Sequence, residues 1–175
     1  MPVYEFPADA GLPAGGATPE AIAAQLDRRG LPHAGIRITC QGETVTLEGQ
    51  VADGDAAELL VLAIGNLQGV ARIEDRLMPA RSPGLLDGLA GFAKLPAGAA
   101  GTEAAETAVH RARVETGSHF GPGRSLLHTM QPGETLAMLA ARHLGGDERR
   151  LREANVAILG DAVPGPGMVI RIPPG

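Results

Sequence analysis

The sequence is poor in aromatic side chains, with no tryptophan, one tyrosine and three phenylalanines among 175 residues. The hydrophobic core must therefore be built mainly from aliphatic side chains. A single cysteine, Cys40, excludes an intramolecular disulfide and fits a reducing compartment. No run of 18 apolar residues is present, so we expect no insertion into a membrane.

Basic clusters are also missing. The formal net charge is −5, the isoelectric point is near 5.5, and no stretch collects lysine or arginine. Nucleic acid is therefore not expected as a partner. The first residues have neither a basic segment nor a long apolar segment, so they do not resemble a secretory signal. We expect a cytoplasmic protein.

Residues 17–78 predict the order helix, strand, strand, helix, strand. Thr18 suits a helix N-cap and Pro19 the first helical position. Residues 36–41 and 44–51 alternate between apolar and polar side chains, as a hairpin of half-buried strands does. Cys40 lies in the apolar series and is expected to be a buried hydrophobe. We predict a small α+β sandwich of three strands with two helices on one face.

The second of these helices should bury one apolar stripe and end at Gly65 and Asn66. Both residue types tolerate the left-handed conformation that often closes a helix. A helix end leaves several carbonyl groups without partners inside the helix. The expected stripe consists of Ala56, Leu59 or Leu60, and Ala63 or Ile64.

Residues 79–125 are rich in glycine, alanine and serine and show little apolar periodicity. So long a connection is unusual inside one domain, so we place a domain boundary here. Residues 84–95 and 102–115 could be helical. A partly helical linker is favoured, and a docked amphipathic segment is the alternative.

Residues 126–175 predict a compact unit of strand, helix, helix and strand with a two-stranded sheet. The first helix should bury Leu136, Leu139 or Ala140, and His143. The second should begin after Asp147.

No catalytic constellation is present in the sequence. The five histidines lack the spacing and the neighbouring carboxylates of a zinc site. No serine lies in a nucleophile-elbow pattern, and no glycine-rich segment has phosphate-loop spacing. We therefore predict a protein that is not an enzyme.

The segment HTMQPGETLAMLAARHLGG, followed by LREAN and PGPGMVIRIP, resembles the LysM domain over residues 127–173. The family's positions are held here by Gly133, Glu134, Thr135, Leu136, Asn155, Gly167, Ile170, Ile172 and Pro173. Two positions depart from the family: His128 stands where tyrosine is usual, and Leu144 where an aromatic residue is common.

Residues 17–78, with LLVLAIGNLQGVARIEDRL, resemble the BON domain. The two resemblances together are those of the BON–LysM potassium-binding protein family, and Phe6, Asp9, Ala10 and Gly11 fit the opening segment of that family. The longer linker departs from it. The resemblance implies an N-terminal ion-binding segment (1–16), a BON domain (17–78), a linker (79–125) and a LysM domain (126–175).

The same resemblance implies a monomeric ion sensor of the stress response, with the potassium ion as its ligand and compaction of the domains on binding. It places the ion against main-chain carbonyls, those of Pro7, Ala10, Leu12, Gly65 and Leu67. A neutral carbonyl ring can replace the weakly held water of K⁺, whereas carboxylate cages favour divalent ions.

Two alternatives stay open. One is a LysM protein that binds peptidoglycan or N-acetylglucosamine through Gly133, Glu134, Thr135 and Asn155. Sugar sites generally use aromatic platforms, and residues 126–175 contain no aromatic side chain, so glycan is the less favoured ligand. The other alternative is a scaffold that binds no ion.

Overall fold

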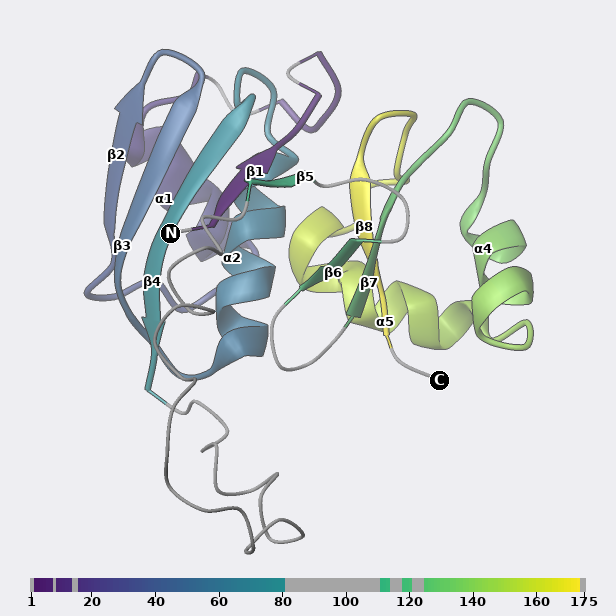
Figure 1. The fold of residues 1–175 in the computed structure, drawn as a ribbon. Helices are drawn as coiled ribbons and strands as arrows, with labels where there is room; N and C mark the ends of the chain where they lie inside the picture. Colours follow the sequence, from purple (N-terminus) through teal and green to yellow (C-terminus); the bar gives the residue numbers. More distant parts are fainter. Residues whose placement is uncertain are drawn as a thin grey trace, which may run out of the picture.

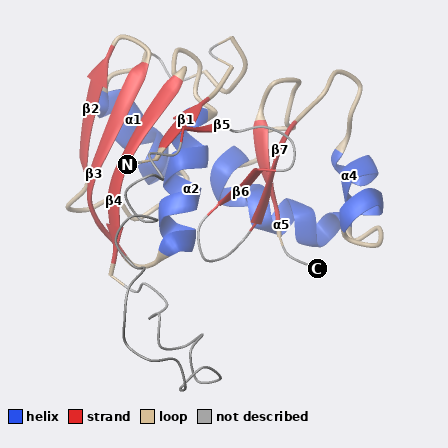
Figure 2. Ribbon diagram, viewed as in Figure 1, coloured by secondary structure: helices blue, strands red, loops and turns tan. Residues whose placement is uncertain are grey.

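The computed structural model describes residues 2–7, 9–13, 16–80, 111–113, 118–120 and 125–173, with the backbone alone for 111–113 and 118–120. Within these ranges, two sheets and four helices are arranged in two layered units that pack side by side (Figures 1 and 2). No helix in these ranges is long and apolar enough to cross a bilayer.

The first sheet has five strands in the order β2-β3-β4-β1-β5. Within residues 17–78 the predicted order of helix, strand, strand, helix, strand is confirmed, and β1 and β5, from outside that range, extend the sheet beyond the three predicted strands. The added β1 is short and flanked by prolines, so its sequence shows no alternation long enough to signal a strand. The strands are β1 (Val3–Glu5), β2 (Arg37–Gln41), β3 (Thr44–Val51), β4 (Arg72–Pro79) and β5 (Arg111–Arg113).

Both helices of this unit begin at side-chain caps. In α1 (Pro19–Arg28) the hydroxyl of Thr18 accepts a hydrogen bond from the N–H of Ala21. In α2 (Gly54–Gly65) the carboxylate of Asp53 accepts one from the N–H of Ala56. Each cap satisfies one of the free N–H groups of a helix start.

The prediction of a single buried stripe on α2 was wrong. Leu60, Val61, Leu62, Ala63 and Ile64 are all buried, so apolar side chains surround the helix. The reason is its position: α2 lies between the five-stranded sheet and the C-terminal unit (Figure 1). A helix covered on two sides loses amphipathic periodicity.

Residues 125–173, the C-terminal unit, contain β7 (Ser125–Thr129), α4 (Leu136–His143), α5 (Glu148–Leu159) and β8 (Val169–Ile172). This is the predicted order of elements. The sheet has three strands instead of two, because β6 (Ser118–Phe120) pairs with β7. His143 is only partly buried, whereas Leu136, Leu139 and Ala140 are buried as expected.

The predicted linker, residues 79–125, contains the strands β5 and β6. β5 lies within residues 102–115, where a helix was considered. The helix considered over 84–95 lies outside the described residues. Cys40, expected to be buried, is half-buried because β2 is an edge strand of the sheet. Burial, together with Glu20, raises the pKa of its thiol.

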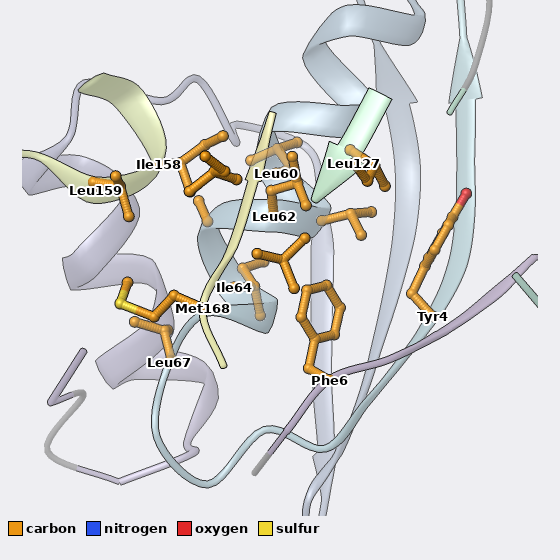
Figure 3. Packing of buried hydrophobic residues seen from close by; sticks show 14 of the residues in the cluster. Tyr4, Phe6, Leu60, Leu62, Ile64, Leu67, Leu127, Ile158, Leu159 and Met168 are labelled. Atoms are coloured by element: carbon orange, nitrogen blue, oxygen red, sulfur yellow. The ribbon is translucent and has the colours of Figure 1, made fainter. Parts of the chain in front are cut away.

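The two units share one hydrophobic core. Helix α2 contacts α5 and β8, and its Leu60 and Ile64 belong to the same cluster as Leu127 of β7 and Ile158 of α5 (Figure 3). The two units therefore bury apolar surface against each other, which stabilises their docking.

Candidate functional site

The N-terminal segment runs directly along the turn that follows α2. Leu12 donates its N–H to the carbonyl of Asn66 at 2.7 Å, and its own carbonyl accepts from the N–H of Gln68 at 3.0 Å. Leu12 and Leu67 thus form a parallel β-bridge. Gly11, just before Leu12, has φ +131°, and a Cβ on it would lie 2.5 Å from the Asn66 carbonyl oxygen. Only glycine allows so close an approach of two backbones.

The carbonyl groups at the end of α2 differ in how they are satisfied. The last four carbonyls of a helix lack partners within it. Leu62 accepts from the backbone and side chain of Asn66, Ala63 from Arg29, and Ile64 from Leu67. Gly65 receives no hydrogen bond from the described residues, and it is buried. The carbonyl of Gly65 is therefore the one that stays available for another ligand.

Three of the other predicted carbonyls already accept hydrogen bonds. Those of Pro7, Leu12 and Leu67 each accept one backbone hydrogen bond, from Ala10, Gln68 and Val70 respectively. A carbonyl oxygen has a second lone pair that can contact a cation. The structure thus places Leu12 beside Leu67, and Pro7 within hydrogen-bonding distance of Ala10.

The loop at residues 164–168 of the C-terminal unit packs against the N-terminal segment. A Cβ built on Gly167 would lie 2.5 Å from the Cβ of Ala10 and 3.7 Å from that of Pro7. The N-terminal segment is therefore held between the α2 turn and the C-terminal unit. Leu67 and Met168 belong to the cluster that covers this junction (Figure 3).

Replacing Gly167 by alanine should separate this loop from the N-terminal segment. Gly133 is a matched control, because its φ of +81° is close to the +82° of Gly167 and a Cβ on it meets nothing within 4 Å. Gly133→Ala should cost only the backbone strain, whereas Gly167→Ala should cost about 1–3 kcal/mol more. Urea denaturation of both variants measures the difference. Equal losses would contradict the contact.

Asn66, inside the turn, binds the two units together with its side chain. Its Nδ2 donates to the carbonyl of Val169 at 2.7 Å and to that of Leu62 at 2.9 Å, and its Oδ1 accepts from the N–H of Val169 at 2.7 Å. The side-chain amide thus replaces a neighbouring strand at the edge of β8 that faces away from β7.

Asn155 makes the same arrangement two residues further along β8. Its Nδ2 donates to the carbonyls of Leu151 and Arg171, and its Oδ1 accepts from the N–H of Arg171 at 2.7 Å. One asparagine of α5 and one that follows α2 therefore satisfy the free edge of β8. Asn155 has a structural role here, and its side-chain amide is fully used.

A buried acidic group lies at the same interface. Glu58 of α2 is fully buried, and its Oε1 lies 2.9 Å from Nε of Arg171 on β8. Arg171 also pairs with Asp55 at 3.2 Å and donates to the hydroxyl of Ser125 at 2.8 Å. Burial raises the pKa of Glu58 to about 7, although Arg171 and Ser125 oppose the shift.

The remaining residues of the predicted glycan loop bond within the C-terminal unit. Glu134 accepts hydrogen bonds from the buried His128, from the N–H of Gln131 at 3.1 Å and from Arg142 at 3.2 Å. Burial raises the pKa of Glu134, but these partners outweigh it and hold the pKa below its ordinary value. The hydroxyl of Thr135 accepts a hydrogen bond from the N–H of Met138 and so caps α4, and Gly133 lies in the preceding turn with φ +81°. These groups stabilise the loop itself.

A small pocket lies beside this loop, and it contains no aromatic ring. It is lined by Leu136, Arg152, Asn155, Val156, Leu159, Gly160, Asp161 and Ala162. Among the residues described, no group of three or more His, Cys, Asp or Glu side chains could hold a metal ion.

Sequence reasoning did not identify the roles of Asn66, Glu58 and Arg29. Glu58 left a signal, because it is the single charged residue within the apolar run 56–64. Asn66 was interpreted only as a helix end, because its partner Val169 is 103 positions away. No local pattern predicts so distant a hydrogen bond.

Comparison with known proteins identifies the first unit. A search of curated proteins gave no match. Residues 17–78 match the family model of the BON domain, and BON domains are often linked to the binding of phospholipids or other ligands. The likeness of the C-terminal unit to LysM remains a resemblance of sequence motif and element order. The protein thus carries a BON domain at its N-terminal end, spanning α1 to β4.

Proposed function

We propose that the protein is a cytoplasmic potassium-binding sensor whose ion lies between the N-terminal segment and the turn after α2. The ligands are the carbonyls of Pro7, Ala10, Leu12, Gly65 and Leu67. The observation that carries the proposal is the buried carbonyl of Gly65, which receives no hydrogen bond from the described residues although its three helical neighbours are satisfied.

The chemistry of these groups favours K⁺. Neutral carbonyl oxygens suit a large, weakly hydrated ion. A helix end adds partial negative charge, which attracts a cation without a carboxylate. Magnesium and calcium, by contrast, are usually bound through carboxylates.

Ion binding in this position would also tighten the junction of the two units. Ala10 contacts Gly167 of the C-terminal unit, and Asn66 bonds to Val169. An ion that orders the N-terminal segment would therefore stabilise the contacts on both of its sides. Compaction in K⁺ is the expected readout.

The test compares thermal stability in KCl and NaCl at equal ionic strength. K⁺ should stabilise the protein by RT ln(1 + [L]/Kd), which is about 3 kcal/mol at a hundredfold excess over Kd. Gly11→Ala should remove this difference, because its Cβ would force the segment away from Asn66. Identical melting of the wild type in both salts would overturn the proposal.

Gly16→Ala is the matched control for this experiment. Gly16 also has a positive φ, +114°, but a Cβ on it meets nothing within 4 Å. It should retain the difference between the two salts. Deletion of the N-terminal segment would be a poor test, because β1 belongs to the sheet and Tyr4 and Phe6 to the core.

A glycan-binding role has less support. The polar groups that it would require, on Glu134, Thr135 and Asn155, are engaged within the fold. Calorimetry with chitin oligomers would show low-micromolar binding if this alternative were right.

A further inference from the structure

Arg29 places a positive charge at the same helix end that the proposed ion site uses. It caps the C-terminus of α1, and its Nη1 donates to the carbonyl of Ala63 at 2.9 Å. The side chain is partly buried, and no carboxylate of the described residues pairs with it. Burial, and then the neighbouring Arg28, lower the pKa of its guanidinium.

The position of this charge bears on any ion bound at Gly65. The carbonyls of Ala63 and Gly65 are two residues apart, which is about 3 Å along the helix axis and about 200° around it. The guanidinium therefore offsets the partial negative charge of the helix end. The guanidinium also repels a cation bound near Gly65, and this repulsion is twice as strong for a divalent ion as for a monovalent one.

We propose that Arg29 sets the charge selectivity of the ion site, so that a monovalent cation is accepted and a divalent cation is disfavoured. This inference rests on the proposed potassium site. The site is then selective by two means: neutral carbonyl ligands, and a fixed positive charge at the same helix end. The carbonyl of Ala63 accepts the hydrogen bond from Arg29 and is therefore not available to the ion. The carbonyl of Gly65 is then the free one at the helix end.

The experiment measures K⁺ and Ba²⁺ binding to the full-length protein by calorimetry, at constant ionic strength. Ba²⁺ is the probe because it is a divalent ion close to K⁺ in size. Arg29→Gln removes the charge and keeps an amide that can donate to Ala63. Arg28→Gln is the control, because Arg28 is exposed and bonds only to Ala24 of its own helix in the described structure.

In Arg29→Gln, K⁺ affinity should rise about threefold and Ba²⁺ affinity about tenfold, the square of the first factor, because the interaction scales with ionic charge. Arg28→Gln should change both by less than about twofold, since an exposed charge is screened. Arg29→Lys retains the charge and should keep the wild-type ratio of K⁺ to Ba²⁺ affinity. If Arg29→Gln does not fold, the ratio measured in Arg29→Lys tests the inference.

Three results would overturn the inference. One is an unchanged ratio of K⁺ to Ba²⁺ affinity in Arg29→Gln, which would show that Arg29 only caps α2. Another is weaker binding of both ions in that variant. The last is a changed ratio in Arg29→Lys. Wild-type protein that binds no K⁺ would instead overturn the proposed function itself, and the inference with it.

Discussion

Replacing Asn66 by alanine is expected to destabilise the native state by about 3 kcal/mol, because it leaves buried polar groups of Val169 without partners. The N–H and the carbonyl of Val169 both bond to this one side chain, and an alanine there offers neither a donor nor an acceptor. The loss should appear in urea denaturation as a lower midpoint.

Hydrogen exchange separates this effect from general destabilisation. The amide of Val169 should exchange faster in Asn66→Ala, while that of Arg171 should stay protected by Asn155. Asn155→Ala should show the reverse pattern. Gln68→Ala, an exposed change in the same turn, should alter neither amide. Equal exchange of Val169 in the wild type and Asn66→Ala would contradict the role that we assign to Asn66.

Stability should also fall as the pH rises from about 4.5 to about 7, and Glu58 should account for most of the fall. Its pKa is about 7 in the folded protein and 4.5 in the unfolded chain. The folded state therefore binds the extra proton, so this contribution is fully present below pH 4.5 and is lost as the pH rises through 7. A shift of this size corresponds to roughly 3 kcal/mol.

Glu58→Gln should flatten the stability profile between about pH 4.5 and 7, as measured by urea denaturation at several pH values. Some slope should remain, because burial also raises the pKa of Asp75. Asp55→Asn is the control: Asp55 is half-exposed and pairs with the same Arg171, so its removal should leave most of the slope. A steep profile in Glu58→Gln would show that another group is responsible.

The docking of the two units would then depend on pH. Glu58 faces Arg171 of β8 and Ser125 of β7, with Asp55 on its own helix. Tyr4 of β1 is close enough for Glu58 and Asp75 to contribute to its raised pKa, after burial. Two carboxylates thus share one arginine, and a proton on Glu58 removes the excess negative charge.

Much of the fold was predictable because it depends on local signals. The caps at Thr18, Asp53, Thr135 and Asp147 are side-chain choices that act within three residues. The alternation in β3 predicted that Val45, Leu47 and Val51 are buried, and this is confirmed. In the candidate site, the meeting of the N-terminal segment with the α2 turn was expected from the family resemblance, and Leu12 and Leu67 do form a bridge.

Other features were not predictable because they depend on partners far away in the sequence. β1 is a strand only because β4, some 70 residues later, presents a free edge to it. The apolar run of α2 does not say which of its sides meets the sheet and which meets the C-terminal unit. The same limit explains why the structural roles of Asn155 and Glu134 were interpreted as ligand contacts.

Local chemistry alone therefore decides where α1, α2, α4 and α5 begin, which faces of β3 and β4 are apolar, and that the chain after Gly65 must turn. Tertiary packing decides what the turn is for. Asn66 fills the edge of β8, Arg29 occupies one carbonyl of the helix end, and Gly65 keeps its own carbonyl available. These outcomes depend on which donors reach the helix end in three dimensions, and a buried carbonyl binds whichever partner the fold brings to it.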